Sequence, residues 1–369
     1  MRVALIHDWL TGMRGGEKVL EAIAGIYPKA EIFTLVHVKG SVSALIESRT
    51  IRTSFIQSLP ASGRLYRHYL PLFPMAVEQF DLGEYDLVIS SSHCAAKAVL
   101  PQSQARHVSY CHSPMRYAWD QFGEYFGASR TGALGEAFYR PVMAWLARWD
   151  ASTASRVHRF AANSRFVASR ILRYYGRQAT VVYPPVDTEF YHPAGNSPGG
   201  SFLVVSALVP YKRVDLAIAA CRLAGAPLRI VGIGPDRERL ERQAGGDITF
   251  LGQLTDEEIR REYRHAKAVI LPGAEDFGIV PVEAQACGTP VVALGRGGAL
   301  ETVVDADTGL FFPESTARSL ADALGRLGAM RIDAPRIRDN ALRFSRERFA
   351  GAFRALIEES VAHPPHARW

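Results

Sequence analysis

Residues 266–294 read AKAVILPGAEDFGIVPVEAQACGTPVVAL and combine a strand, a loop, a helix and a second strand. The apolar runs 266–272 and 289–294 are short and rich in β-branched residues, which is typical of buried strands. Between them, GAEDFG reads as a loop. IVPVEAQACG then reads as a helix, with Pro281 in its first turn and Gly288 just past its end. This strand–helix–strand unit predicts a parallel sheet covered by helices.

Similar units extend along most of the 369-residue chain. The first half contains six predicted strands, at residues 2–6, 31–35, 86–90, 106–110, 157–162 and 179–183. The second half also contains six, at residues 201–207, 227–232, 247–252, 266–272, 289–294 and 309–312. Helices fit between many of them, at residues 15–26, 212–224, 234–245, 255–265 and 315–328. We therefore predict an α/β fold with two Rossmann-like, doubly wound parallel sheets that face each other across a cleft.

A segment without periodicity separates the two halves. Residues 183–200, YPPVDTEFYHPAGNSPGG, carry four prolines and three glycines, which is typical of a linker or hinge. It predicts an N-terminal domain over 1–187 and a C-terminal domain over 188–344. A last helix is predicted over about 336–361, and the C-terminal segment of about 345–369 is expected to pack back on the first domain.

The composition excludes several classes of protein. Hydrophobic residues make up 48% of the chain and charged residues 22%, as in globular proteins. An apolar run of about 18 residues, which a spanning helix needs, is absent from the sequence, and MRVALIHDWL reads as a first strand rather than a signal peptide. The four scattered cysteines predict neither a disulfide framework nor a zinc site. We expect a cytoplasmic protein.

The net charge of +6 is concentrated in one segment. Residues 140–177 contain eight arginines and one aspartate. Such a surface attracts phosphate groups of lipids, nucleotides or nucleic acid, although a solvated helical face explains it equally well. A dedicated nucleic-acid-binding module is not recognisable in the sequence, so nucleic acid is not an expected partner.

Glu275 and Glu283 raise the possibility of an acid–base pair, but the predicted elements separate them. Glu275 lies in the loop after a strand, and Glu283 lies about one turn into the helix that follows. The helix start between them offers the N–H groups of Gly278, Ile279 and Val280 to a phosphate. The arrangement favours two anchors on either side of a phosphate, as in a nucleotide diphosphate sugar.

Two further strand–helix junctions are suited to anions. HDWLTGMRGGEKVLEAI places Gly15 and Gly16 where a loop enters a helix, although it lacks the spacing of a P-loop or a dinucleotide fingerprint. SALVPYKRVDLAI places Lys212 and Arg213 at a helix start, where cations are unfavourable unless they face an anion.

Other motifs are more ambiguous. SYCHSPMRYAWD follows a strand and contains His112, Arg116 and Tyr117, which suit a sugar or phosphate site or, alternatively, a packed core. VGIGPDRERL reads as a tight turn that touches a nucleotide base. The D-x-D triplet at Asp305 and Asp307 is explained by turn chemistry, and we predict no metal site.

Several of these stretches together resemble a known family. EDFGIVPVE matches the E-x7-E motif of glycosyltransferase family 4, whose members are retaining transferases with the two-domain GT-B fold. LIHDWLTGMRGGEKVLE, YCHSPMRYAWD, AANSRFVASRI, VVYPPVD, LVPYKRVDLAI and GGALETV are similar to the bacterial mannosyltransferase branch that builds O-antigens and exopolysaccharides. The resemblance covers most of the chain.

The resemblance implies roles at matching positions. Three residues are implied to be catalytic: His112 beside the donor sugar, Lys212 at the diphosphate and Glu275 at the donor-sugar hydroxyls. Seven more are implied to bind the donor, with Glu283 at the ribose: Gly15, Gly16, Arg213, Phe277, Gly278, Ile279 and Glu283. No cofactor is implied apart from the nucleotide sugar as co-substrate. Many relatives carry an arginine five positions before the lysine, where this chain has Ala207.

The resemblance implies transfer of mannose from GDP-mannose to a glycan carried by a polyprenyl diphosphate lipid. A peripheral position at the inner face of the cytoplasmic membrane follows, because several residues suit an anionic membrane or an acceptor: Arg64, Arg67, YLPLF (69–73), Arg116, Tyr117, Trp145 and Trp149. Three alternatives stay open: a UDP-sugar donor, a GT-B sugar-nucleotide epimerase, and a non-catalytic glycan- or membrane-binding scaffold.

Overall fold

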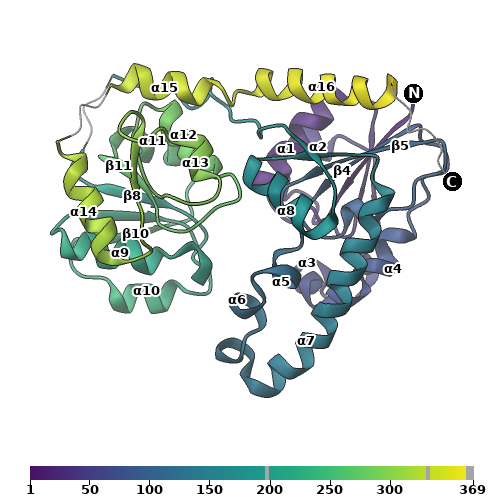
Figure 1. Cartoon of the computed structure of the whole chain (residues 1–369), viewed down its shortest axis with the longest axis horizontal. Coiled ribbons are helices and arrows are strands. Elements are labelled where there is room, and N and C mark those ends of the chain that lie inside the picture. Colours follow the sequence, from purple (N-terminus) through teal and green to yellow (C-terminus); the bar gives the residue numbers. More distant parts are fainter. Residues whose placement is uncertain (196–198, 330–332, 363–369) are drawn as a thin grey trace. The chain divides into compact units, whose positions relative to one another are not determined.

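The computed structural model describes residues 1–195, 199–329 and 333–362. The chain divides into two compact units, each drawn with its own sheet in Figure 1. Unit 1 contains residues 1–185 and the segment that begins at Glu347, and unit 2 contains Val186–Arg346. Three residues of the predicted hinge, 196–198, lie outside the described part, as do residues 363–369 of the predicted C-terminal segment.

Unit 1 is built on a seven-stranded parallel sheet. Its strands are β1 (Val3–His7), β2 (Glu31–Thr34), β3 (Ile51–Thr53), β4 (Leu87–Ser92), β5 (Arg106–Cys111), β6 (Arg159–Ala162) and β7 (Ala179–Val181). The order is β3-β2-β1-β4-β5-β6-β7, so the direction in which strands are added reverses between β1 and β4. The prediction of six strands was wrong by one, because the three-residue β3 gives too short a signal in the sequence.

Unit 2 repeats this arrangement with six parallel strands. They are β8 (Phe202–Val205), β9 (Leu228–Val231), β10 (Ile248–Gly252), β11 (Ala268–Leu271), β12 (Val291–Leu294) and β13 (Gly309–Phe312). Their order is β10-β9-β8-β11-β12-β13, and the reversal lies between β8 and β11. The predicted fold class of two doubly wound parallel sheets is confirmed.

Helices cover both faces of each sheet. Those of unit 1 are α1 (Gly15–Ile26), α2 (Ala44–Glu47), α3 (Ser62–Leu65), α4 (Phe73–Glu78), α5 (Arg116–Trp119), α6 (Phe122–Phe126), α7 (Ala128–Ser152), α8 (Arg165–Tyr175) and α16 (Arg346–Ala362), with 3-10 turns η1 (Phe55–Ser58), η2 (Tyr66–Leu72), η3 (Ala96–Ala98) and η4 (Thr153–Arg156). Those of unit 2 are η5 (Pro210–Lys212), α9 (Val214–Leu223), α10 (Arg237–Gln243), α11 (Asp256–His265), α12 (Ile279–Ala286), α13 (Ala299–Thr302), α14 (Ala317–Leu327) and α15 (Ala334–Leu342).

The two-residue period of a strand explains the two cores of unit 1. Ala4 and Ile6 of β1 point to a core that includes Phe73 of α4 and Leu146 of α7. Leu5, between them, points to the opposite core with residues of α1 and α16. The sheet is therefore buried on both sides, as its almost continuous apolar strands require.

The prediction of one helix over about 336–361 was wrong. The structure has two helices, α15 and α16, which are separated by residues 343–345. Phe344 is buried there against Phe277, with ring centroids 5.4 Å apart, and its carbonyl accepts a 2.8 Å hydrogen bond from Val186 N. This anchoring of the backbone interrupts the helix, and α16 then packs in unit 1, where Phe349 and Phe353 contact the ring of Tyr110.

Candidate functional site

In unit 2, Lys212 and Glu275 meet beyond the carboxyl ends of β8 and β11. Lys212 is the last residue of η5 in the loop after β8, and Glu275 lies in the loop after β11. Lys212 Nζ donates to the carboxylate of Glu275, and the two side chains stay 21% and 11% exposed. Because β8 and β11 flank the reversal of the sheet, this ion pair occupies the position where doubly wound sheets bind ligands.

Two glycines after β12 fix the loop that carries Glu275. Gly298 N donates to the carbonyl of Glu275 at 2.8 Å, and Gly297 forms a bridge with Glu275 at φ +65°. A Cβ at Gly298 would lie only 2.3 Å from Phe277 Cα, which leaves no room for a side chain. The close approach of the two loops therefore requires glycine and defines where the Glu275 carboxylate points.

Helix α12 begins directly after this loop. Gly278 has φ +87°, which favours glycine, and it is the residue before the first helical position, Ile279. Pro281 lies in the first turn of the helix, as predicted, where its missing N–H costs nothing. The N–H groups at this helix start carry positive partial charge and lie in the same loop region as Glu275.

Glu283 lies further along α12 and is turned toward α11. Its carboxylate is 5% exposed and accepts a 2.9 Å hydrogen bond from the hydroxyl of Tyr263. Burial and the carboxylate of Glu283 raise the pKa of Tyr263 well above its usual range, so Tyr263 stays a donor. The implied contact of Glu283 with a ribose stays a prediction.

Arg213 lies next to Lys212 but points toward other partners. It has φ +53°, and its guanidinium contacts Asp215 at 3.3 Å and Ser315 at 3.0 Å. Ala207, at the position where relatives carry an arginine, is exposed in the loop after β8. Arg213 is thus held by an acidic and a hydroxyl side chain in this structure, and a contact with a diphosphate stays a prediction.

In unit 1, a chain of hydrogen bonds connects His112 to the protein interior. His112 follows β5, and its Nε2 lies 2.8 Å from Ser91 Oγ at the end of β4. The same oxygen lies 3.2 Å from Nδ1 of His7, the last residue of β1, and His7 Nε2 is 3.8 Å from the carboxylate of Glu17 in α1. Residues from β1, α1, β4 and β5 therefore converge at the reversal of this sheet.

Gly16 opens space in front of these rings. A Cβ at Gly16 would lie 3.5 Å from His7 Cε1 and 3.7 Å from His112 Nε2. The structure thus brings together two of the predicted residues, Gly16 and His112, beside the first turn of α1, which begins at Gly15. Burial and the neighbouring His93 and His7 hold the pKa of His112 well below its usual range, so its ring is neutral near pH 7.

Asp8 and His93 also belong to this cluster, and the sequence analysis missed them. Asp8 is fully buried directly after β1, and its carboxylate lies 3.0 Å from Nδ1 of His93, the residue after β4. Burial alone would raise the pKa of Asp8, but the imidazoles of His93 and His7 hold it well below its usual range. Their position in the sequence could have identified them, because both residues immediately follow a strand, where doubly wound sheets bind ligands.

Two predicted acceptor residues are partly buried in unit 1. The hydroxyl of Tyr117 lies 2.7 Å from Cys94 Sγ, and its ring contacts Tyr125 and Phe126. Arg116 Nε lies 3.4 Å from Ser113 Oγ. These contacts tie the 113–126 segment to the sheet and support the alternative of a packed core for this motif.

The predicted membrane segment 64–73 is only partly exposed. Arg64 and Arg67 are exposed, and Arg67 lies over the ring of Tyr66 at 5.4 Å. Leu70 and Phe73 of YLPLF, however, are 7% and 1% exposed and belong to the core of unit 1. Trp145 is 46% exposed, whereas Trp149 is partly buried and donates to Glu78.

Much of the basic segment 140–177 is neutralised by partners elsewhere in unit 1. Arg156 pairs with Glu78, Arg159 with Glu359 and Arg170 with Asp120. Arg177 donates to the carbonyls of residues 154, 157 and 158. Both interpretations of the segment therefore apply in part: these arginines hold the fold together, while Arg148, Arg165 and Arg173 are exposed.

The remaining motifs have structural explanations. Cβ atoms at Gly232 and Gly234 would lie 1.8 Å from the carbonyl oxygen of Ser206 and 2.2 Å from that of Leu208, so these glycines allow two loops to touch. Asp307 pairs with Arg336 at 2.5 Å. Within the part of the chain that the structure describes, no group of three or more His, Cys, Asp or Glu side chains is arranged to hold a metal ion.

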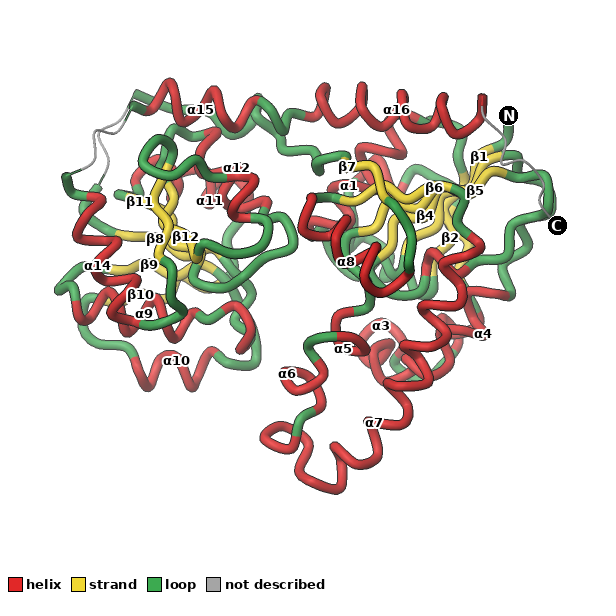
Figure 2. The backbone as a smooth tube through the Cα atoms, in the orientation of Figure 1, coloured by secondary structure: helices red, strands yellow, loops and turns green. Residues whose placement is uncertain are grey.

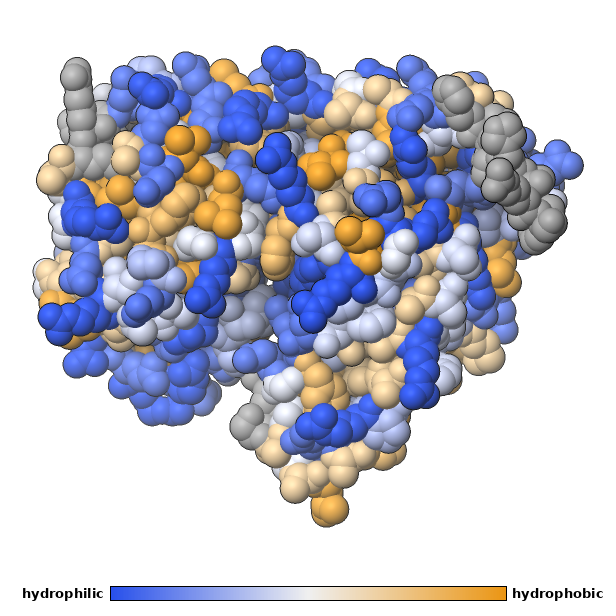
Figure 3. All heavy atoms as spheres, viewed as in Figure 1, coloured by the Kyte–Doolittle hydropathy of each residue, from blue (hydrophilic) through white to orange (hydrophobic). Residues whose placement is uncertain are grey.

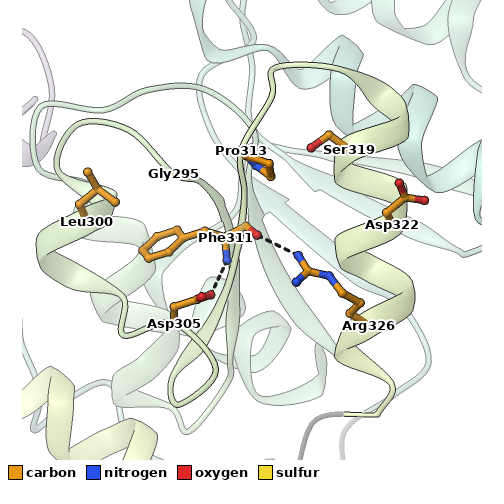
Figure 4. Close-up of a pocket in the computed structure, with 8 residues that line it drawn as sticks. All are labelled: Gly295, Leu300, Asp305, Phe311, Pro313, Ser319, Asp322 and Arg326. Carbon is orange, nitrogen blue, oxygen red and sulfur yellow. Dashed lines mark hydrogen bonds between the residues drawn. The ribbon is translucent and has the colours of Figure 1, made fainter.

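A cavity of about 610 Å³ lies at the β13 edge of the sheet of unit 2 (Figure 4). Two of its three charged groups hold the edge strand: Asp305 accepts from Phe311 N at 3.0 Å, and Arg326 donates to Phe311 O at 3.1 Å. These side chains pair the backbone groups that an edge strand leaves open. The cavity is thus on the opposite side of β12 from the Lys212–Glu275 pair, and Asp305 and Arg326 are engaged with the edge strand.

Comparison with protein families gives one match in each half of the chain. Residues 189–344 match the family described as glycosyl transferases group 1, and residues 15–190 match the family described as Glycosyltransferase Family 4. Together the two matches run from residue 15 to residue 344. Among the described residues, no helix is both long and apolar enough to cross a membrane.

Curated relatives carry glycosyltransferase names. The D-inositol 3-phosphate glycosyltransferase of Mycobacteroides abscessus is 35% identical over 170 residues, which are 40% of this chain and 38% of that protein. The GDP-mannose-dependent alpha-(1-6)-phosphatidylinositol monomannoside mannosyltransferase of Mycolicibacterium smegmatis is 32% identical over 197 residues, or 44% and 51% of the two chains. The chain thus spans about half the length of these relatives or less.

Solved structures share the fold at low identity. HepE of Anabaena, in complex with UDP, superposes with a TM-score of 0.72 at 20% identity over 97% of this chain and 100% of that chain. Sucrose-phosphate synthase of Thermosynechococcus elongatus gives a TM-score of 0.73 at 18% identity over 98% and 100%. With the two parallel sheets, these similarities establish the GT-B fold.

Proposed function

We propose that the chain is a family 4 glycosyltransferase and that it transfers mannose from GDP-mannose, with retention, to a lipid-linked oligosaccharide or polysaccharide precursor. The observation that carries the proposal is the Lys212–Glu275 pair beside the start of α12, beyond the carboxyl ends of β8 and β11. Support for the donor comes from the name of the mycobacterial relative, which includes GDP-mannose.

The unit 2 residues suit the leaving group of such a transfer. Negative charge grows on the diphosphate as its bond to the anomeric carbon breaks. Lys212 and the N–H groups of Gly278 and Ile279 would stabilise that charge without the need to reorganise, which is often the largest contribution to catalysis. Glu275 would bind hydroxyls of the donor sugar. The acceptor hydroxyl would enter from the same face, and the leaving phosphate would take its proton.

His112 and the start of α1 would serve the same reaction from unit 1. The hydrogen bond between Ser91 and His112 holds the ring of His112, and a neutral imidazole suits a contact with a sugar hydroxyl. Gly15 and Gly16 would leave the start of α1 open to the pyrophosphate. Because Lys212 and the helix N–H groups neutralise the leaving group in this proposal, we expect a metal chelator to leave the activity unchanged.

A panel of nucleotide sugars tests the donor. We expect GDP-mannose to raise the melting temperature of the protein more than UDP-, ADP- or TDP-sugars do, and the product with an acceptor to be an α-linked glycoside. A UDP-sugar is the second candidate, because HepE was solved with UDP. An acceptor-free conversion of the nucleotide sugar would instead indicate an epimerase. If no nucleotide sugar bound, the scaffold alternative would replace the proposal.

An acceptor on a lipid would require contact with a membrane, and α7 supports this. Leu134, Phe138 and Trp145 are 90%, 66% and 46% exposed, and their spacing places them on one face of the helix. Helix α7 extends from the body of unit 1 (Figures 1 and 2), and Figure 3 shows hydrophobic side chains at its outer end. Exposed aromatic and aliphatic side chains with nearby arginines suit an anionic lipid surface.

Flotation with vesicles tests this part of the proposal. We expect the protein to float with vesicles that contain anionic phosphatidylglycerol and to float less with neutral vesicles. Phe138→Ser should weaken the binding, while Leu223→Ser, a change at an equally exposed apolar residue of unit 2, should leave it unchanged. Equal binding by the wild type to both vesicles would refute an inner-membrane position set by anionic lipid.

A further inference from the structure

His93 lies beside His112 but has no role in the reaction described above. It follows β4 at the reversal of the sheet of unit 1, and its side chain is 31% exposed. Its ring lies 6.3 Å from that of His112 and 6.2 Å from that of His7. Trp9 contacts it edge-on at 4.5 Å and supports one side of the ring. His93 is therefore a partly open imidazole at the ligand-binding edge of the sheet.

Asp8 fixes the backbone that carries His93. One carboxylate oxygen accepts hydrogen bonds from the N–H groups of His93 and Cys94 at 2.7 and 3.0 Å. The other accepts from those of Ala95 and Ala96 at 2.6 and 2.7 Å. Four donors from one turn hold Asp8 as a carboxylate, and the carboxylate in turn holds the turn in a single conformation.

Asp8 also determines which nitrogen of His93 is free. The carboxylate oxygen that lies 3.0 Å from Nδ1 can only accept, so Nδ1 carries a proton and donates to it. In the neutral ring, the lone pair is then on Nε2. The same carboxylate–imidazole arrangement orients histidines in many active sites, because it fixes both the ring and its tautomer.

The chemistry of Nε2 selects its ligand. The lone pair on Nε2 is an acceptor, and the negative charge of Asp8 lies on the other side of the ring. It is therefore a poor partner for a phosphate, whose oxygens are also acceptors. It is a good partner for a hydroxyl, which offers a proton. A sugar supplies several such hydroxyls, and the adjacent His112 is already assigned to one in the proposed reaction.

We propose that His93 is a substrate-binding residue whose Nε2 accepts a hydrogen bond from a sugar hydroxyl, with Asp8 as the positioning residue that aims it. This inference rests on the proposed function for the identity of the sugars. The hydroxyl can belong to the acceptor or to the donor sugar, and kinetics separate these two sources.

The decisive variant is His93→Asn. Its amide N–H can still donate to Asp8, but no atom replaces Nε2. We expect a rise of about tenfold in the KM of one sugar, as the loss of one hydrogen bond predicts. His93→Gln places an amide oxygen near the lost Nε2 and should recover most of the affinity. His158→Asn is the matched control, because His158 is a partly buried histidine beside the start of β6, at the other end of the strands.

Two kinetic assays are needed, with methyl α-mannoside as the acceptor probe. If the KM for methyl mannoside rises while hydrolysis of the donor without acceptor is unchanged, His93 binds the acceptor. If hydrolysis and the KM for the donor change instead, His93 binds the donor sugar. If both KM values of His93→Asn stay within twofold of wild type, the inference is wrong.

Failure of the proposed function would be seen separately, as a wild-type protein that turns over none of the nucleotide sugars. In that case, nitrogen NMR of the protein with labelled histidine tests whether His93 binds a sugar, because this measurement does not require enzyme turnover. We expect the Nε2 resonance of His93 to shift when methyl mannoside is added. A resonance that methyl mannoside does not move would overturn the inference.

Discussion

The two units share one strand order but use their lysine–carboxylate pairs differently. In unit 1, Lys97 and Asp150 are 1% and 0% exposed. In unit 2, Lys212 and Glu275 are 21% and 11% exposed. Each lysine follows a strand that flanks the reversal of its sheet, yet one pair is closed off from solvent and the other is open. Burial, more than residue type, separates a pair that holds the fold from one that can meet a ligand.

The partners of each lysine agree with this distinction. Lys97 Nζ forms an ion pair with the carboxylate of Asp150 at 3.0 Å, and it donates to the carbonyl of the same residue at 2.5 Å and to Thr153 Oγ1 at 2.9 Å. Tyr175 adds a hydrogen bond to Asp150 at 2.9 Å. The ammonium group is thus surrounded by polar partners inside the protein. An open pair such as Lys212–Glu275 can instead exchange its partner for a diphosphate and a sugar.

The largest effect on stability should come from Lys97→Met. The change leaves the carboxylate of Asp150 buried without its cation, which typically costs about 3–5 kcal/mol in the free energy of unfolding. Urea unfolding followed by tryptophan fluorescence measures it. The double variant Lys97→Met with Asp150→Leu should regain part of the loss, because an apolar pair replaces the ions. A loss below about 1 kcal/mol for the single change would contradict a structural role.

Lys212→Met should instead affect activity. We expect a fall of about 10²- to 10³-fold in kcat/KM with the preferred donor, as for the loss of one preorganised charge in a transition state. The midpoint of urea unfolding should move little, because the pair is partly exposed. Activity within about twofold of wild type would show that Lys212 is not at the leaving group.

Gly298→Ala tests whether the loop geometry of unit 2 is required. The added methyl group would lie within 2.6 Å of Phe277 Cα, Phe277 O and Asp276 O, so the loop with Glu275 must move. We expect a loss of about 3 kcal/mol in the free energy of unfolding, with loss of donor binding. Gly325→Ala in α14, with open space around it, should be neutral or stabilising. Equal changes in the free energy of unfolding for Gly298→Ala and Gly325→Ala would contradict the packing argument.

The units should also differ in their response to acid. In unit 1, burial lowers the pKa of His107 to about 3 from an ordinary value of 6.5. The unfolded chain therefore binds this proton as the pH falls below about 6.5, whereas the folded chain does not. The stability that His107 contributes is present above pH 6.5 and is lost as the pH falls toward 3, by about 2 kcal/mol at pH 5.

His107→Asn should reduce this acid sensitivity. Comparison of urea unfolding midpoints at pH 7.5 and pH 5 for the wild type and the variant measures the difference. His265→Asn in unit 2 is the control, because His265 is exposed in the folded protein. An unchanged pH dependence in His107→Asn would show that other groups are responsible.

The sequence predicted the elements that have strong local signals. Alternation of apolar strands with amphipathic helices was sufficient for the two sheets, and Pro281 and Gly288 were sufficient for the position of α12. The three-residue β3 was missed because two of its residues are exposed and its pattern is too short. The break between α15 and α16 was missed because Phe344 fits a helical apolar face, and only its contacts with Phe277 and Val186 show that the helix stops.

Contacts between residues that are distant in the chain could not be predicted from the sequence. Asp8 and His93 are 85 residues apart and meet because β1 and β4 are neighbours in the sheet. The sequence gives no sign that Lys97 is buried, since its partner Asp150 is 53 residues away in the chain. The ion pairs of the basic segment 140–177 could not be predicted for the same reason, because its acidic partners Glu78 and Glu359 are distant in the chain. Strand order, which composition and periodicity do not determine, is what assembles these sites.

The placement of α16 has a consequence for the order in which the protein matures. The ribosome makes most of unit 1 first, yet the helix that supplies Phe349 and Phe353 to one of its cores is made only after unit 2. Unit 2 is contiguous and its two ends are hydrogen-bonded to each other through Val186 and Phe344. The later-made unit can therefore finish folding first, while the earlier one waits with part of an apolar face uncovered. During synthesis, this face is the surface on which a chaperone would act.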